Sequence, residues 1–89
     1  MKVKLELYGA SRDLSEKNFI EFDVNNKSSI KDLKKKILNY VDHKFRGNDN
    51  YKKIIEASAF CSEDNNIISD NYIINKDQKI GIIPPIGGG

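Results

Sequence analysis

The chemically most suggestive residues lie in the last eleven positions, 79–89, which read Lys-Ile-Gly-Ile-Ile-Pro-Pro-Ile-Gly-Gly-Gly. The branched side chains at 80, 82 and 83 favour a buried strand, because they pack well on a pleated surface. Pro84 and Pro85 should end that strand, since each lacks a backbone N–H and has a fixed φ. Pro85 also restricts Pro84 to extended conformations. We therefore expect the chain to leave the sheet in a defined direction.

The glycines at 87–89 suit a chain end that enters a narrow site in another protein. Glycine has no side chain and accepts most backbone angles, so these residues can pass through a channel that excludes any other residue type. Extended from Pro84, the chain end would reach about 20 Å, at roughly 3.3 to 3.6 Å per residue. It would present the carboxylate of Gly89 as its reactive group. The alternative is a frayed terminus or residues added by cloning.

Composition indicates one small soluble domain. The chain has 89 residues, 38% of them hydrophobic and 31% charged, and no apolar run approaches the roughly 20 residues that span a bilayer. Residues 1–7 alternate between polar and apolar and do not form the apolar block of a signal peptide, so we expect a cytoplasmic protein without a membrane partner. Fifteen basic and 13 acidic residues are interspersed, for a net charge of +2, which argues against a nucleic-acid partner.

The sequence shows no catalytic machinery of its own. Cys61 is the single cysteine and has no partner for a disulfide or a metal site, so we interpret it as a packing residue. His43 lacks further ligands at metal-binding spacing. No Ser-His-Asp or Cys-His combination and no phosphate-binding glycine loop is present. The lysines at 34–36 predict a solvated helix face, with a docking role as the alternative.

Periodicity predicts an α+β domain over 1–86, followed by a flexible glycine tail at 87–89. Period-two alternation predicts strands, and steps of three and four residues from Ile30 to Phe45 predict a helix. Ser29 and Asp32 resemble a capping box, and Gly47 is a plausible helix stop. We expect a loop at 9–15, a helix at 29–45, and strands at 2–8, 18–24, 53–60, 67–68 and 79–83, with the first and last strands parallel and central in a mixed sheet.

Two stretches resemble one known family. Residues 8–14, Tyr-Gly-Ala-Ser-Arg-Asp-Leu, are similar to its aromatic-small-x-x-Arg-acid-Leu loop, and residues 77–89 are similar to its turn, apolar strand, Pro-Pro, aliphatic residue and terminal Gly-Gly. The chain thus resembles the ubiquitin-like β-grasp sulfur carriers, most closely the small subunits of molybdopterin synthase. The double proline favours these over the thiamine-pathway and tRNA-thiolating carriers.

The resemblance implies a ubiquitin-like β-grasp fold with four to five strands packed on one main helix. It implies that Gly89 is adenylated and then thiocarboxylated, with ATP and a sulfur donor supplied by partners and no cofactor bound. The partners would be an adenylyltransferase that resembles ubiquitin-activating enzymes and the large synthase subunit, in a heterotetramer. The chain would donate sulfur to the cyclic pterin precursor of the molybdenum cofactor. The implied tail and partner-binding residues are Gly88, Gly87, Ile86, Pro85, Pro84, Ile82, Ile83 and Arg12.

Other functions remain open from the sequence. A sulfur carrier for thiamine synthesis or tRNA thiolation, or a ubiquitin-like protein modifier, would use the same tail with a different receiver. A plain interaction domain with an incidental glycine tail is a further alternative. In the favoured interpretation, partners bind the exposed side of the sheet near the last strand, through Ile82 or Ile83.

Overall fold

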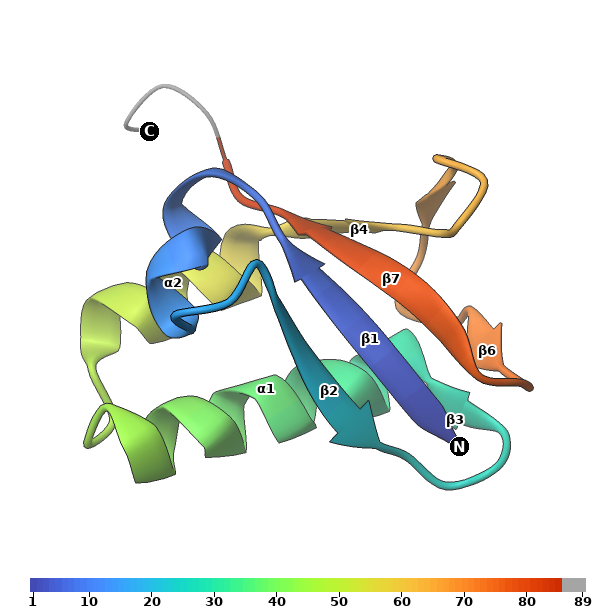
Figure 1. The fold of residues 1–89 in the computed structure, drawn as a ribbon, viewed down its shortest axis with the longest axis horizontal. Coiled ribbons are helices and arrows are strands. Elements are labelled where there is room, and N and C mark those ends of the chain that lie inside the picture. The colour runs from blue at the N-terminus through green and yellow to red at the C-terminus, as the bar shows by residue number, and fades with distance from the viewer. Residues whose placement is uncertain (86–89) are drawn as a thin grey trace.

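A computed structural model gives the structure of residues 1–85 (Figure 1). Two α-helices and a 3-10 helix accompany seven strands, of which several are very short. In chain order they are β1 (Lys2–Leu7), the 3-10 helix η1 (Gly9–Leu14), β2 (Phe19–Asp23), β3 (Ser28–Ser29), α1 (Ile30–Lys44), α2 (Asp49–Ala57), β4 (Ala59–Cys61), β5 (Ile67–Ile68), β6 (Ile73–Ile74) and β7 (Gln78–Ile83).

Five strands form one mixed sheet in the order β2-β1-β7-β4-β5, and β3 pairs with β6 in a small separate sheet. β1 and β7 are parallel, with Leu5 opposite Ile80, while the other neighbours in the main sheet are antiparallel. Parallel neighbours require a long crossover, and the crossover from β1 to β7 contains both α-helices. The predicted α+β fold, with parallel first and last strands at its centre, is confirmed.

The hydrophobic core lies between the sheet and α1, which crosses one face of the sheet (Figure 1). Alternation along β1 sends Val3, Leu5 and Leu7 to that face, and all three are buried. Ile80 and Ile82 of β7 point the same way and are 0% exposed. Four further core residues come from α1 at helical spacing, namely Ile30, Leu33, Ile37 and Val41. Within residues 1–85, no helix covers the opposite face of the sheet (Figure 1).

The ends of α1 follow the sequence prediction. Ser29 is the N-cap, its side chain accepts a hydrogen bond from the Asp32 N–H, and the Asp32 carboxylate accepts one from the Ser29 N–H. This reciprocal pair is the predicted capping box. At the other end the Gly47 N–H donates to the Val41 carbonyl at 3.2 Å, with φ of +70°. The helix itself ends at Lys44 with Phe45 as its C-cap, and both Arg46 and Gly47 are left-handed, with φ of +55° and +70°. The predicted stop at Gly47 therefore lies two residues beyond the cap.

The predicted strand at 53–60 is wrong over most of its length. Residues 49–57 form α2, and only 59–61 are a strand. Asn48 caps the helix, because its side chain accepts the Tyr51 N–H, and Tyr51 and Ile55 then lie one turn apart and face the core. A second helix therefore joins the one main helix that the resemblance implied.

The predicted loop at 9–15 contains an ordered 3-10 helix. The Ser11 side chain is buried; its hydroxyl donates to the Tyr8 carbonyl and accepts from the Tyr8 N–H. The Tyr40 hydroxyl of α1 donates to the Leu14 carbonyl at 2.6 Å. These contacts attach η1 to the body of the protein.

Ser29→Ala should lower the free energy of unfolding by about 1 kcal/mol, because it removes the cap of α1.

The hydrogen bonds from Ser29 hold the pKa of Asp32 below its ordinary value of 3.8. Since the folded pKa is the lower one, the stability from this carboxylate is complete above pH 3.8 and is lost as the pH falls below it.

Asp32→Asn should therefore reduce the loss of stability on acidification below about pH 4, measured by urea unfolding at a series of pH values. Asp64→Asn, in the exposed turn before β5, is the matched control for the loss of one exposed carboxylate. Identical acid sensitivity of wild type and Asp32→Asn would contradict this role of the cap.

Candidate functional site

The structure fixes the point at which the chain leaves the sheet. β7 lies between β1 and β4, and the residue after it, Pro84, is buried while Pro85 is exposed. Pro84 packs beside Gly9, where an added Cβ would lie 3.8 Å from the Pro84 Cγ. The predicted tail residues Ile86, Gly87, Gly88 and Gly89 lie outside the described residues, so their roles stay predictions.

Only one of the two predicted partner-binding isoleucines reaches the surface. Ile82 is 0% exposed and belongs to the core, with Leu7 and Phe60 as its neighbours in register on the adjacent strands. Alternation places Ile83 on the other face, where it is half-buried. The expectation that either residue could contact a partner is therefore corrected to Ile83 alone.

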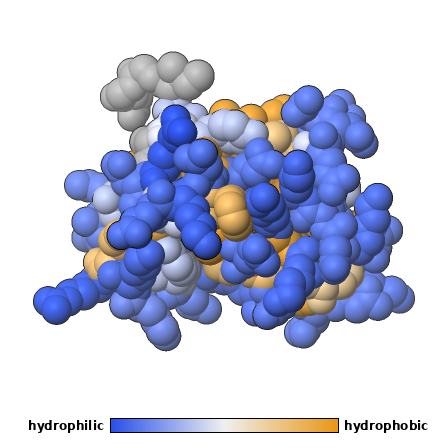
Figure 2. All heavy atoms as spheres, in the orientation of Figure 1, coloured by the Kyte–Doolittle hydropathy of each residue, from blue (hydrophilic) through white to orange (hydrophobic). Residues whose placement is uncertain are grey.

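Ile83 belongs to an apolar hollow on the uncovered face of the sheet, next to the exit of the chain. The hollow has a volume of about 410 Å³ and is lined by Tyr8, Cys61, Asn65, Ile67 and Ile83, which we call the exit patch. Tyr8 is 47% and Ile67 is 68% exposed, unusually high for large apolar side chains. Figure 2 shows orange atoms along the upper edge of the molecule. Exposed apolar surface of this kind marks partner sites.

Gly81 allows two members of the exit patch, Tyr8 and Cys61, to approach each other closely. It pairs with Glu6 of β1 and Cys61 of β4, and it is buried although it lies on the uncovered face. A Cβ at this position would lie 2.7 Å from the Cys61 Sγ and 3.0 Å from the Tyr8 Cε2. The missing side chain thus allows Cys61 and Tyr8 to close over β7 from both sides.

A polar strip borders the exit patch. The Tyr8 hydroxyl donates to the Glu6 Oε2 at 2.8 Å, and this hydrogen bond raises the pKa of Tyr8 above its ordinary 10.0. The Lys79 Nζ lies 3.8 Å from the Glu6 Oε1, and the Lys79 backbone N–H donates to the Glu63 Oε1 at 3.0 Å. Tyr8 therefore keeps its proton at neutral pH and turns its ring toward the apolar hollow while its hydroxyl faces the strip.

Arg12, also predicted to bind a partner, lies elsewhere. It is exposed on η1, and its guanidinium donates to the Asn18 Oδ1 at 3.1 Å. It lines a groove with Lys44 and Phe45 at the end of α1 and is not part of the exit patch. Its predicted role in partner binding stays a prediction.

Sequence reasoning missed the other members of the exit patch as site residues. Tyr8 continues the outward-facing series of Lys2, Lys4 and Glu6. Strand alternation therefore predicted an exposed aromatic side chain at position 8, which could have indicated a binding residue. Ile67 was predicted on an edge strand, where one of two adjacent isoleucines must face outward. Nothing local places Cys61 and Asn65 beside them, because that depends on the strand order.

The described residues hold no alternative site of a familiar kind. Within 1–85, no group of three His, Cys, Asp or Glu side chains is placed to hold a metal ion. No helix in this part of the chain is both long and apolar enough to cross a membrane.

Comparisons with known proteins identify the fold. No family model matches the sequence, and no curated protein matches it. The structure is similar to SAMP1 from Haloferax volcanii, with a TM-score of 0.70 and 11% identity over 100% of both chains. It is similar to a putative molybdopterin converting factor, subunit 1, from Pyrococcus furiosus, with a TM-score of 0.70 and 16% identity over 96% of this chain and 98% of that one. It is also similar to a Caldiarchaeum subterraneum ubiquitin, with a TM-score of 0.61 and 14% identity over 100% of this chain and 98% of that one. The predicted ubiquitin-like β-grasp fold is confirmed.

Gly81→Ala should lower the free energy of unfolding by about 1 to 3 kcal/mol, because the new methyl group overlaps Cys61 and Tyr8 in a packed site. Adding Cys61→Ala should recover part of the loss, since it removes the closest atom. Urea unfolding of the two single variants and the double variant measures the coupling. Strict additivity of the two changes would show that Cys61 does not close over Gly81.

Proposed function

We propose that this chain is a sulfur carrier of the molybdopterin synthase type, with Gly89 as the terminal residue that carries sulfur as a thiocarboxylate. One observation supports this most: the central strand β7 runs through buried Pro84 toward the glycines beside an exposed apolar hollow. In this proposal the exit patch binds the partner, and the chain that continues from Pro84 brings Gly89 to the partner's reactive site. The function needs no catalytic residue in the chain itself.

The proposed chemistry proceeds in two steps on the Gly89 carboxylate. A carboxylate is a poor acyl donor, because its charge is delocalised and oxide would have to leave. An adenylyltransferase partner resembling ubiquitin-activating enzymes would join the carboxylate to the α-phosphate of ATP, releasing pyrophosphate. Hydrosulfide delivered by a sulfur donor would then attack the carbonyl carbon and displace AMP, which leaves a thiocarboxylate and releases a proton.

The thiocarboxylate would donate its sulfur to the cyclic pterin precursor held by a large synthase subunit. Positioning of the reactive end supplies much of the rate in such a transfer. The exit patch would bind both partners in turn, since each must hold the body of the protein while the tail enters its site. The Pro-Pro sequence and the fold shared with a putative molybdopterin converting factor subunit support this pathway.

A ubiquitin-like modifier is the second candidate. The fold shared with an archaeal ubiquitin favours it, and the same adenylated Gly89 would then form an amide with a lysine of another protein. The two functions share activation of the tail and differ in the receiver, so they can be separated by the product formed.

Incubation with an adenylyltransferase of the ubiquitin-activating type, ATP and a sulfur donor should add to the intact protein the mass difference between sulfur and oxygen. The added mass should map to the C-terminal peptide. A variant lacking Gly88 and Gly89 should unfold at the same urea concentration but remain unmodified, because its end no longer reaches the activating site. Sulfur at the end of the truncated chain would exclude this role for Gly89.

Ile67→Asp should weaken binding to the large subunit or the adenylyltransferase about tenfold or more, because it places a charge in the exit patch. Ile67 is exposed, so the folded monomer should be unaffected. Lys35→Glu, on the outer face of α1, is the control. Titration calorimetry that shows a loss for Lys35→Glu but none for Ile67→Asp would move the interface to the helix.

A further inference from the structure

The stretch 8–14 contacts the end of β7 at the point where the chain leaves the sheet. Figure 1 shows the segment after β1 passing close to the last residues of β7. Gly9 begins η1 with φ of +54°, a left-handed conformation that glycine adopts without strain. A Cβ added to Gly9 would lie 3.8 Å from the Pro84 Cγ and 3.9 Å from the Pro84 Cδ. The main chain of Gly9 therefore lies beside the ring of Pro84, which is buried, whereas the next residue, Pro85, is exposed.

Hydrogen bonds of a buried serine hold the first turn of η1. Ser11 is 1% exposed, and its hydroxyl donates to the Tyr8 carbonyl at 2.6 Å and accepts the Tyr8 N–H at 2.9 Å. The Ser11 N–H also donates to the Tyr8 carbonyl, at 3.1 Å. Gly9 lies between the two residues that these bonds join. Its main chain is therefore held in place beside Pro84.

The other end of η1 is attached to α1. The Leu14 side chain is 2% exposed, and its carbonyl accepts the Tyr40 hydroxyl at 2.6 Å. η1 is thus held by the end of β1 on one side and by α1 on the other. An element held at both ends gives Pro84 a fixed neighbour.

We propose that Gly9 and Ser11 are positioning residues that set the direction in which the chain continues past Pro85. Gly9 acts through its contact with Pro84, and Ser11 acts by holding Gly9. Neither residue touches the reacting atoms. This inference rests on the proposed function, because the direction matters only if Gly89 has to reach a partner's reactive site. A displaced chain end would then react more slowly even when the partner binds as tightly as before, since positioning supplies much of the rate.

Stiffness of the two prolines is the alternative explanation for a directed exit. Each proline fixes its own φ wherever its ring lies, so stiffness alone predicts similar consequences for the loss of either ring. The contact with Gly9 involves the ring of Pro84, whereas Pro85 is exposed. Variants at positions 84 and 85 therefore separate the two explanations.

Main-chain order at position 85 tests the contact without any partner. Pro85→Ala supplies an amide there, and its nitrogen-15 order parameter should be about 0.8, because Pro84 remains held. Adding Gly9→Val should lower it below about 0.6, since a β-branched residue does not tolerate the left-handed conformation. Gly9→Asn should keep the higher value, because asparagine does tolerate that conformation. Equal order parameters in all three proteins would overturn the proposal.

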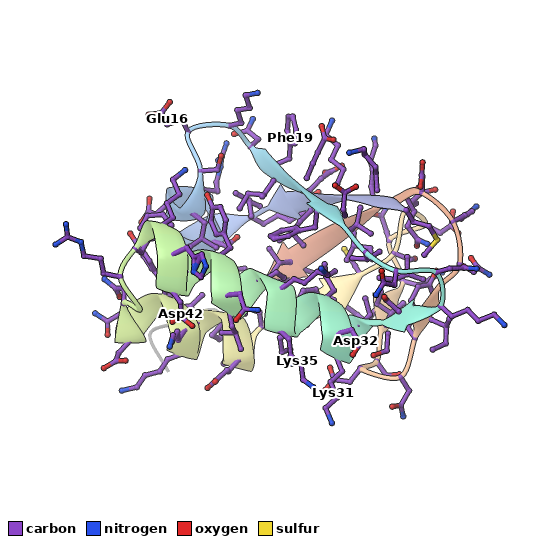
Figure 3. The ribbon with its side chains drawn as sticks, turned by 90° about the horizontal axis from the view of Figure 1, so that it is seen from below. Glu16, Phe19, Lys31, Asp32, Lys35 and Asp42 are labelled. Atoms are coloured by element: carbon purple, nitrogen blue, oxygen red, sulfur yellow. The ribbon has the colours of Figure 1, made fainter. Side chains whose placement is uncertain are left out.

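Two further variants complete this measurement. Ser11→Ala removes the hydroxyl bonds but leaves Gly9 in place, and it should lower the order parameter in the same direction as Gly9→Val. Glu16→Ala is the control, because Glu16 follows η1 and points into solvent (Figure 3); it should leave the order parameter unchanged. Urea unfolding establishes that each variant is folded, and Ser11→Ala decides the test if Gly9→Val does not fold.

Activation by an adenylyltransferase of the ubiquitin-activating type tests the consequence for function. The rate of pyrophosphate release from ATP is measured with this chain as the varied substrate. Pro84→Ala should lower kcat about tenfold and change KM less than about twofold, whereas Pro85→Ala should lower kcat less than about threefold. Gly9→Val should resemble Pro84→Ala, while Gly9→Asn and Glu16→Ala should resemble the wild type.

The outcomes separate this inference from the proposed function. Equal losses of kcat in Pro84→Ala and Pro85→Ala would assign the exit to proline stiffness and overturn the positioning role, although the chemistry at Gly89 would stand. A rise in KM with unchanged kcat would also overturn it, because these residues would then belong to the binding surface. Absence of pyrophosphate release from the wild-type chain would contradict the proposed function, and the positioning role would then stand or fall on the order parameters.

Discussion

The parallel pairing of β1 with β7 at the centre of the sheet is the constraint on which the rest of the structure depends. Parallel neighbours cannot be joined by a tight turn, so the chain between them must cross over the sheet, and α1 buries the core on that path. The carboxyl ends of two parallel strands lie at the same end of a sheet. Tyr8 after β1 and Pro84 after β7 are therefore brought together, and the chain exit acquires its neighbouring surface.

The same central position separates the packing and binding roles of β7. Ile80 and Ile82 face α1 and stabilise the core, whereas Gly81 and Ile83 face the uncovered side. Gly81 lets Cys61 and Tyr8 approach from β4 and the end of β1. A strand that is buried on one face thus forms, on the other, the floor of an apolar hollow at the point where the tail begins.

Strong periodicity explains which parts of this arrangement were predictable. β1, β7 and α1 have clear alternation or helical spacing, and their prediction holds together with the capping box at Ser29. The strand prediction for residues 53–60 failed because Ile55, Ala57 and Ala59 alternate as they would in a strand. The Asn48 cap and the packing of Tyr51 favour a helix instead. The exit patch combines residues 8, 61, 65, 67 and 83, which only the strand order brings together. The sequence predicted that the first and last strands are neighbours, but no local pattern shows that β4 and β5 follow on the other side of β7.

The central claim is that this chain delivers sulfur from Gly89 to a pterin. The most direct measurement mixes the thiocarboxylated protein with a large molybdopterin synthase subunit and the cyclic pterin precursor, and follows the products by mass spectrometry. The account predicts a dithiolene pterin, with two carriers returned to the carboxylate form for each pterin converted. An unchanged pterin, together with amide bonds from Gly89 to lysines of other proteins, would contradict it and identify a protein modifier.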